Sequence, residues 1–208
     1  LDGNSTDLSG NYNGTDTNIT YAYDGTETNI EYRFGRFGQA ALFNGSSSAI
    51  DGMTNSYVFD NTNKRGSLSF WVNFASLSTT QALINRWDNR SGDNSVWGLW
   101  YVNGSDYLQF THRDSSNNNT VATSNTSLFT INTWHHISLV WNQSTVTFYV
   151  DSVEEGTVTN SNFNDTLDTA AGELTFGATR RTSPLYQEVL NGSIDQVRIY
   201  STALTSSQ

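Results

Sequence analysis

The chain has no cysteine, one proline and a single lysine among its 208 residues. The lack of cysteine excludes disulfide bonds, thiolate metal ligands and a cysteine nucleophile. Charged residues make up only 14% of the chain, and 20 acidic side chains against 10 basic ones give a net charge of −10. Because nucleic-acid binding needs a basic surface, this balance argues against a nucleic-acid partner. No apolar run is long enough to insert into a membrane.

Uncharged polar residues dominate instead, with 24 Asn, 26 Ser and 27 Thr. Asn disfavours helix interiors and Thr favours strands, so this composition predicts strands joined by polar turns. An aromatic content of 13% is too high for a disordered chain, because that much apolar surface supports a core.

Alternating apolar and polar residues predict an all-β protein. In residues 67–74, Leu68, Phe70, Val72 and Phe74 occupy every second position and would share one face. No ten-residue segment has helical periodicity, and there is no linker or internal repeat, so we expect one domain over residues 1–208. Residues 142–145 read as a hairpin loop, and the Asn-rich stretches 115–120 and 160–165 read as longer loops. Strands are predicted at residues 39–43, 67–74, 82–85, 96–102, 107–111, 137–141, 146–150, 174–177 and 194–200. This pattern is typical of a two-sheet antiparallel β-sandwich or jelly roll.

Four short motifs stand in order along nearly the whole chain. They are FGRFGQAALFNG at 34–45, SLSFWV at 67–72, WHHI at 134–137 with YVD at 149–151, and NGSIDQVRIY at 191–200 followed by Ala203 and Leu204. Together they resemble the laminin-G-like, concanavalin A-like jelly-roll family. The chain departs from that family at Ser152, where glycine usually follows the Asp, so a different turn type is expected there.

The resemblance implies two antiparallel sheets around an aromatic core. Family members act mainly as non-catalytic binding modules for glycans or proteins within larger extracellular proteins. The same fold also houses glycoside hydrolases and lyases, so the fold alone does not decide the function.

The N-terminal loop, residues 2–13, is rich in side-chain oxygens, which are the ligands of a hard cation such as Ca²⁺. In the resembling family, a D-x-S-G-N loop and the Asp of the closing motif often surround a structural calcium. That likeness gives Asp7, Asn11 and Asp195 as candidate ligands, with Asp2 and Asn4 as weaker ones. The alternative is a loop of Asx turns that binds no metal.

Catalytic groups are scarce. The related hydrolases carry alternating acids, E-x-D-x-x-E, on one strand, and none of the six Glu residues forms that pattern. His135 and His136 are adjacent on a predicted strand, so their rings face opposite ways and cannot chelate one ion together. His112 is left free to face a ligand, but no Ser and Asp near it in sequence complete a triad.

Outward aromatic side chains are the better functional candidates. If Trp97, Leu99 and Tyr101 face the core, Gly98 and Trp100 face outward, and an indole beside glycine suits stacking on a sugar ring. Arginine adds planar donors that match the carboxylate of an acidic sugar. The candidate ligand-binding residues are Trp87, Trp100, Arg86, Arg113, Arg180, Arg181 and Tyr186. The alternative is that both Trp residues are covered by loops and only complete the packing.

We therefore expect a non-catalytic module of a cell- or virion-surface adhesin that recognises carbohydrate and carries a structural calcium. The chain opens at Leu1 without a signal peptide, so we expect it to be part of a longer protein. Two alternatives remain: protein–protein adhesion without sugar binding, and an enzyme with two carboxylates in one cleft.

Overall fold

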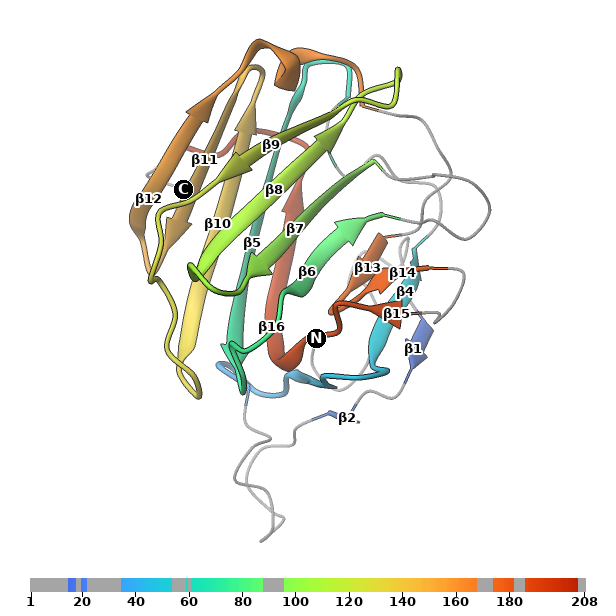
Figure 1. Cartoon of the computed structure of the whole chain (residues 1–208), viewed down its shortest axis with the longest axis vertical. Coiled ribbons are helices and arrows are strands. Elements are labelled where there is room, and N and C mark those ends of the chain that lie inside the picture. Colours follow the sequence, from blue (N-terminus) through green and yellow to red (C-terminus); the bar gives the residue numbers. More distant parts are fainter. Residues whose placement is uncertain are drawn as a thin grey trace, which may run out of the picture.

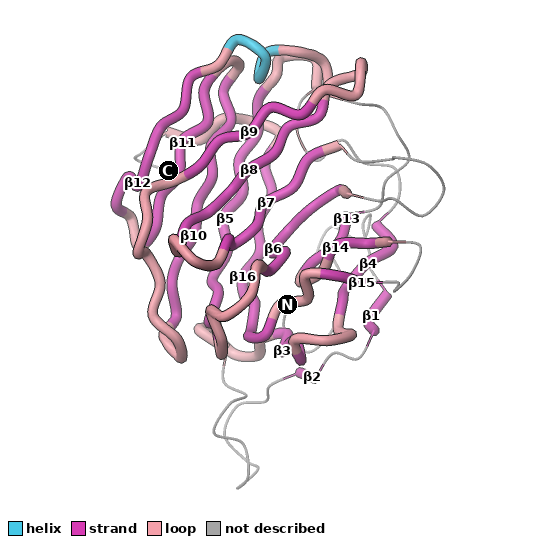
Figure 2. Tube along the Cα trace, in the orientation of Figure 1, coloured by secondary structure: helices cyan, strands magenta, loops and turns pink. Residues whose placement is uncertain are grey.

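Two antiparallel sheets face each other in a sandwich, as the sequence predicts (Figure 1). The computed structural model describes residues 15–17, 20–21, 35–53, 59, 61–87, 96–167, 174–181 and 186–205. Strands dominate this part of the chain, and its helical content is one 3₁₀ turn, η1 (Ser161–Asn164) (Figure 2). The described segments contain no helix that could span a membrane.

Each large sheet has seven strands. Sheet A has the order β1 (Thr15–Thr17), β4 (Ala49–Met53), β13 (Leu174–Phe176), β6 (Gln81–Arg86), β7 (Trp97–Val102), β8 (Tyr107–Arg113) and β9 (Asn119–Thr123). Sheet B has the order β12 (Val153–Thr159), β11 (Thr145–Val150), β10 (Trp134–Asn142), β5 (Arg65–Phe74), β16 (Asn191–Tyr200), β3 (Ala41–Asn44) and β2 (Thr20–Tyr21). A short ribbon pairs β14 (Thr179–Arg180) with β15 (Tyr186–Gln187). Strands β6 to β9 of sheet A lie in front of sheet B in Figure 1.

The core fills the space between the sheets. Leu68, Phe70, Val72 and Phe74 of β5 are fully buried, which confirms the predicted alternation. The register pairs β5 with β10 on one side and β16 on the other, so β5 is central in sheet B. Aromatic rings close the core, and Phe59 stacks on Trp97 with ring centroids 4.6 Å apart.

Two tight hairpins connect β10, β11 and β12. Gln143 and Ser144 form the predicted loop between β10 and β11. Asp151 and Ser152 connect β11 to β12 with φ of +50° and +70°. Positive φ at both central residues defines a type I′ turn, which favours glycine. Ser152 therefore adopts a backbone conformation that favours glycine, and the turn is not of a type that suits serine better.

The strands that sequence reading missed include the edge strands β9 and β12. β12 has no fully buried side chain, and β9 buries Thr120 and Ala122 but exposes Val121, so neither sequence shows a strong alternation of apolar and polar residues. Their strand conformation comes from hydrogen bonding to β8 and β11. The predicted loop at residues 115–120 is therefore wrong at Asn119 and Thr120, which begin β9. The predicted loop at 160–165 contains η1, which buries Phe163.

Candidate functional site

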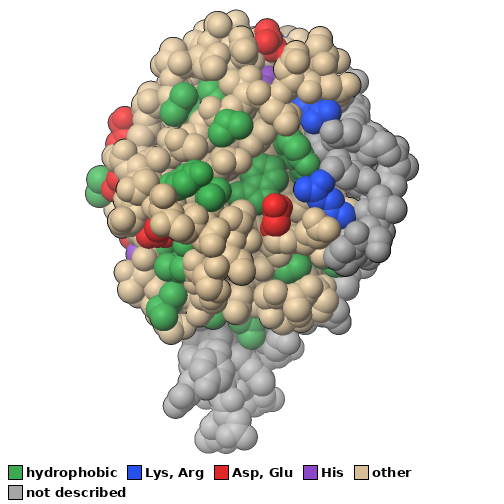
Figure 3. Space-filling model, viewed as in Figure 1, with side chains coloured by type: hydrophobic (Ala, Val, Ile, Leu, Met, Phe, Trp, Pro, Cys, Tyr) green, Lys and Arg blue, Asp and Glu red, His purple; other side chains and the backbone are tan. Residues whose placement is uncertain are grey.

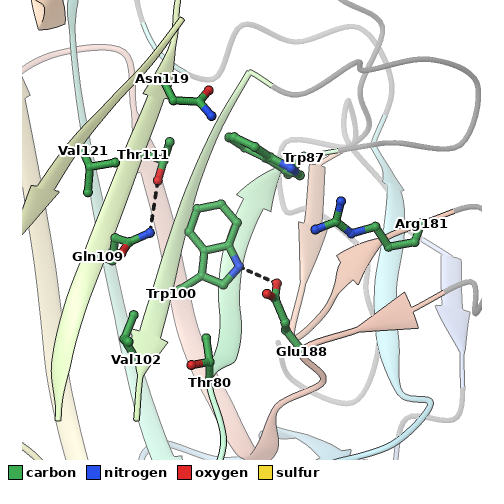
Figure 4. A pocket seen from close by; sticks show the side chains of 10 residues that line it. All are labelled: Thr80, Trp87, Trp100, Val102, Gln109, Thr111, Asn119, Val121, Arg181 and Glu188. Atoms are coloured by element: carbon green, nitrogen blue, oxygen red, sulfur yellow. Dashed lines mark hydrogen bonds between the residues drawn. The ribbon is translucent and has the colours of Figure 1, made fainter. Parts of the chain in front are cut away.

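An open pocket of about 270 Å³ lies on the outer face of sheet A. Its lining residues come from β7, β8, β9 and the segments around β6 and the β14–β15 ribbon (Figure 4). In the space-filling view, hydrophobic side chains gather near the middle of this face beside acidic and basic groups (Figure 3). The lining residues are Thr80, Trp87, Trp100, Val102, Gln109, Thr111, Asn119, Val121, Arg181 and Glu188.

Trp100 forms the floor of the pocket. Trp97, Leu99 and Tyr101 of β7 are buried in the core, so Trp100 points to the opposite face, as predicted. A β-carbon at Gly98 would overlap the six-membered ring of Trp100, so the indole lies against the bare strand backbone. The side chain is held closely, because only 7% of Trp100 is exposed.

Neighbouring groups fix the orientation of this indole. Its Nε1–H donates to Glu188 Oε2 at 3.0 Å and to Thr179 Oγ1 at 3.2 Å. The Thr179 hydroxyl donates to the same Glu188 oxygen at 2.6 Å. Trp87 meets the Trp100 ring edge-on, at 5.4 Å between centroids and 81° between planes. The pocket therefore has a rigid aromatic corner.

Polar side chains surround that corner. Gln109 and Thr111 project from β8 and are joined by a hydrogen bond of 3.4 Å (Figure 4). Arg181 extends from the opposite side of the pocket, beyond Glu188 (Figure 4). The arrangement combines two indole rings with amide, hydroxyl, guanidinium and carboxylate groups, a mixture of apolar and polar groups that is typical of small-molecule sites.

A family model described as the concanavalin A-like lectin/glucanases superfamily matches residues 44–208. The chain belongs to this superfamily. No curated protein sequence matches the chain significantly. The superfamily assignment agrees with the two-sheet sandwich and confirms the fold that the four motifs implied.

Solved structures similar to this concanavalin A-like domain include carbohydrate- and receptor-binding modules. Domain 4 of AbnA, a GH43 extracellular arabinanase from Geobacillus stearothermophilus solved with arabinotriose, is 26% identical, with a TM-score of 0.67 over 99% of this chain and 90% of that one. The binding domain of Paraclostridial Mosquitocidal Protein 1 is 18% identical, with a TM-score of 0.70 over 97% of this chain and 47% of that one. The Ruminococcus gnavus IT-sialidase CBM40, bound to α2,3 sialyllactose, is 12% identical, with a TM-score of 0.59 over 76% and 90%.

The predicted ligand residues of this concanavalin A-like domain fall into two groups. Trp87, Trp100 and Arg181 line the pocket. Arg113 is not a lining residue, and its guanidinium lies 6.0 Å from the Trp87 ring centroid. Three others do not line it. Arg86 is buried in β6, Arg180 lies in β14, and Tyr186 packs in a small apolar cluster with Ala49, Ala178 and Val189. A role in ligand binding stays a prediction for all of them.

Glu188 is the charged pocket residue that sequence reading missed. It follows β15 with φ of +52°, a left-handed conformation that is uncommon for glutamate. In the sequence it is only one of six Glu residues that form no hydrolase pattern. Glu188 belongs to the pocket through its contacts with Trp100 and Thr179, which lie 88 and 9 residues earlier in the chain.

The expectation that His112 is free to face a ligand is wrong. His112 has the same parity on β8 as Leu108 and Phe110, so its ring enters the core and meets Trp141 and Phe163 edge-on. Burial lowers the pKa of His112, against an opposing hydrogen bond between Nε2 and the Asp165 carbonyl. Because its imidazole is buried in the core, His112 cannot contact a ligand in the pocket.

The two adjacent histidines face opposite sides of β10, as predicted. His135 points inward, where Nε2 accepts from the Thr130 N–H at 3.2 Å. Nδ1 of His135 therefore carries the proton and donates to Asp151 Oδ2 at 2.7 Å. His136 lies on the outer face of sheet B, with its Nε2 2.9 Å from Ser69 Oγ.

Of the predicted calcium ligands, the structure places Asp195. Asp2, Asn4, Asp7 and Asn11 lie outside the described residues. The Asp195 side chain is fully buried in β16 and accepts the N–H of Phe37 at 2.9 Å and of Gln196 at 2.7 Å. No group of three or more His, Asp or Glu residues able to hold a metal occurs within the described ranges.

Proposed function

We propose that this domain is a non-catalytic carbohydrate-binding module of an extracellular protein, and that its ligand occupies the pocket over Trp100. The observation that carries the proposal is the indole of Trp100, laid against the backbone at Gly98 and tied by its N–H to Glu188. A fixed aromatic face binds the C–H face of a sugar ring without first paying the entropy of ordering a side chain.

The shape of the site supports sugar over a protein partner. The two indoles of Trp87 and Trp100 line a pocket shared with Gln109, Thr111 and Arg181. A protein-docking surface is typically a flat apolar patch of several hundred Å². A sugar instead needs a small concave surface with hydroxyl partners around an apolar floor, which this pocket provides.

The similar solved structures support the same class of ligand. One was solved with arabinotriose and another with α2,3 sialyllactose, so both are suitable first probes. The higher identity of 26% and the nearly complete coverage make arabinotriose the first choice.

The chemistry of the pocket favours binding over hydrolysis. Glycoside hydrolysis requires two carboxyl groups on either side of the scissile bond. Among the lining residues of the described pocket, Glu188 is the one acid, and its Oε2 already accepts from Trp100 and Thr179. A carboxylate held in this way orients the indole.

Isothermal titration with arabinotriose and with 3′-sialyllactose tests the function. We expect one of them to bind, and Trp100→Ala to weaken its affinity by about tenfold or more, as loss of an aromatic contact should. Ile131→Ala, an exposed apolar residue that does not line the pocket, is the control and should bind as the parent does. The proposal fails if neither sugar binds at millimolar concentration, or if Trp100→Ala leaves the affinity unchanged.

We also propose that a structural calcium joins the N-terminal loop to β16 through Asp195. The proposal of a cation at this place is supported by the negative charge of the Asp195 carboxylate, which is buried. Its oxygens accept hydrogen bonds from the backbone N–H groups of Phe37 and Gln196. Burial of an anion is costly, and a neighbouring Ca²⁺ would offset that cost.

A further inference from the structure

The outer face of sheet B carries a second aromatic cluster, on the opposite side of the sandwich from the pocket. Trp71 of β5 and His136 of β10 are cross-strand partners, and their ring centroids lie 5.1 Å apart. The hydrogen bond between His136 and Ser69 holds the imidazole beside the indole. Both rings are half-buried, because the loop at residues 35–38 crosses this face.

Asp195 anchors that loop. Its Oδ2 accepts the N–H of Phe37, and the N–H of Gly35 donates to the Gly38 carbonyl at 3.1 Å to close the turn. A β-carbon at Gly35 would lie 2.7 Å from Asp195 Oδ2, so only glycine lets the loop approach the carboxylate so closely. The loop thereby presents Arg36 and Phe37 to Trp71.

Arg36 is held by two rings. Its Cζ lies 4.7 Å from the Trp71 ring centroid and 5.2 Å from that of Phe37, and the two rings meet edge-to-face at 6.1 Å. Within the part of the chain that the structure describes, Arg36 forms no hydrogen bond or ion pair, although it is exposed. Stacking uses the face of a guanidinium and leaves its N–H edges available for a bidentate acceptor.

Basic and acidic groups both lie near this cluster, on a strongly acidic protein. Arg198 of β16 is exposed and close enough to His136 to contribute to its lowered pKa, after the larger effect of burial. Asp151 acts in the opposite direction on the same ring. Two exposed guanidinium groups, those of Arg36 and Arg198, therefore lie on this face of the sandwich.

We propose that this cluster is a second binding site, specific for a sugar that carries a carboxylate. The carboxylate pairs with the N–H edge of Arg36, and the apolar face of the sugar ring packs on Phe37, which is 53% exposed. An acidic sugar combines these two features within the size of one ring. The site is separate from the pocket over Trp100, because Trp71 and His136 belong to sheet B and the loop with Arg36 packs on Trp71.

Titration followed by NMR of the Trp71 indole N–H tests this site. The probes are trigalacturonic acid, its methyl ester and 3′-sialyllactose, and the resonance is assigned with Trp71→Phe. We expect at least one of the two acidic sugars to shift the Trp71 signal, the methyl ester to leave it unchanged, and Arg36→Gln to weaken binding about tenfold or more. Phe37→Ala provides a second, uncharged test with the same expected direction.

Trp100→Ala separates this site from the pocket. It should leave the acidic-sugar response at Trp71 intact even if it abolishes binding in the pocket. The proposal is overturned if neither acidic sugar shifts Trp71, if the methyl ester binds equally well, or if Arg181→Gln but not Arg36→Gln removes binding. A shift caused by a hexaglutamate peptide but by neither sugar would also overturn it, in favour of a protein ligand.

Discussion

The indole of Trp100 rests against Gly98, two residues earlier on the same strand. Residues two apart on a strand share a face, so the missing side chain of Gly98 creates the space that the ring fills. The hydrogen bond to Glu188 then fixes the rotation of the ring within that space. The flat floor of the pocket thus depends on one glycine and one distant carboxylate.

Gly98→Ala should displace the Trp100 ring. The added methyl group overlaps the indole, and overpacking of this kind typically costs about 1–3 kcal/mol. We expect a lower free energy of unfolding in a urea titration and weaker sugar binding in the same variant.

A double-mutant cycle isolates the cause. In a Trp100→Ala background the methyl group meets no ring, so Gly98→Ala should then be nearly neutral. An equal loss of stability in both backgrounds would mean that Gly98 is required by the strand itself and not by the indole.

Calcium removal should destabilise the domain. A cation that binds only the native state stabilises it, so EDTA should lower the melting temperature by about 5–10 °C relative to 1 mM CaCl₂ for a Kd of about 10 µM. Asp7→Ala should abolish the difference. Asp195→Ala is a poorer test, because it also releases the N–H of Phe37. Identical melting curves with and without calcium would exclude the site.

Strand parity explains which parts of the fold the sequence could predict. The alternation in β5, β7, β8, β10 and β11 depends on local patterning, and it placed Trp100 outward and Phe110 inward. The same rule applied one step further along β8 would have placed His112 in the core. The sequences of the edge strands β9 and β12 lack that apolar alternation, because each strand has a neighbour on one side only and buries small or polar residues or none.

The candidate sites depend on contacts that no local pattern encodes. Glu188 reaches Trp100 across 88 positions, and Phe37 reaches Asp195 across 158. Glu188 stands in no motif, and the motif at residues 34–45, which contains Phe37, does not indicate a contact with Asp195. The closing motif gave Asp195 as a calcium ligand, and that role stays a prediction; its carboxylate accepts backbone N–H groups of Phe37 and Gln196.

The stability of the domain should fall as the pH decreases below about 6.5. Burial lowers the pKa of both His112 and His136, so the unfolded chain binds protons in a range where the native state does not. The stability that these two histidines contribute is therefore complete when the pH lies above the histidine pKa of the unfolded chain. It is lost as the pH falls toward their lower pKa values in the folded protein. Urea titrations between pH 7.5 and 5 measure this slope.

His112→Phe keeps an aromatic ring against Trp141 and Phe163 but cannot titrate. This variant should reduce the change in unfolding free energy between pH 6.5 and 5. His136→Gln should reduce the part of that change that remains. A slope that is unchanged in both variants would assign the pH dependence to other groups. Some desolvation raises the pKa of Asp114, but hydrogen bonds from Asn118 and Ser116 lower it below its ordinary value of 3.8. Asp114 therefore affects stability only at pH values below the range of these titrations.

Ser152→Gly should stabilise the domain. Ser152 has φ of +70° in the turn between β11 and β12, a conformation that costs a residue with a β-carbon about 1–2 kcal/mol. Glycine removes that cost but loses some entropy on folding, so we expect a net gain of up to about 1 kcal/mol, or about 2–4 °C in melting temperature. Ser144→Gly is the matched control in the preceding hairpin, where serine is not among the residues with positive φ, and it should give no gain. If Ser144→Gly stabilises the domain as much as Ser152→Gly does, the effect does not come from the left-handed backbone at Ser152.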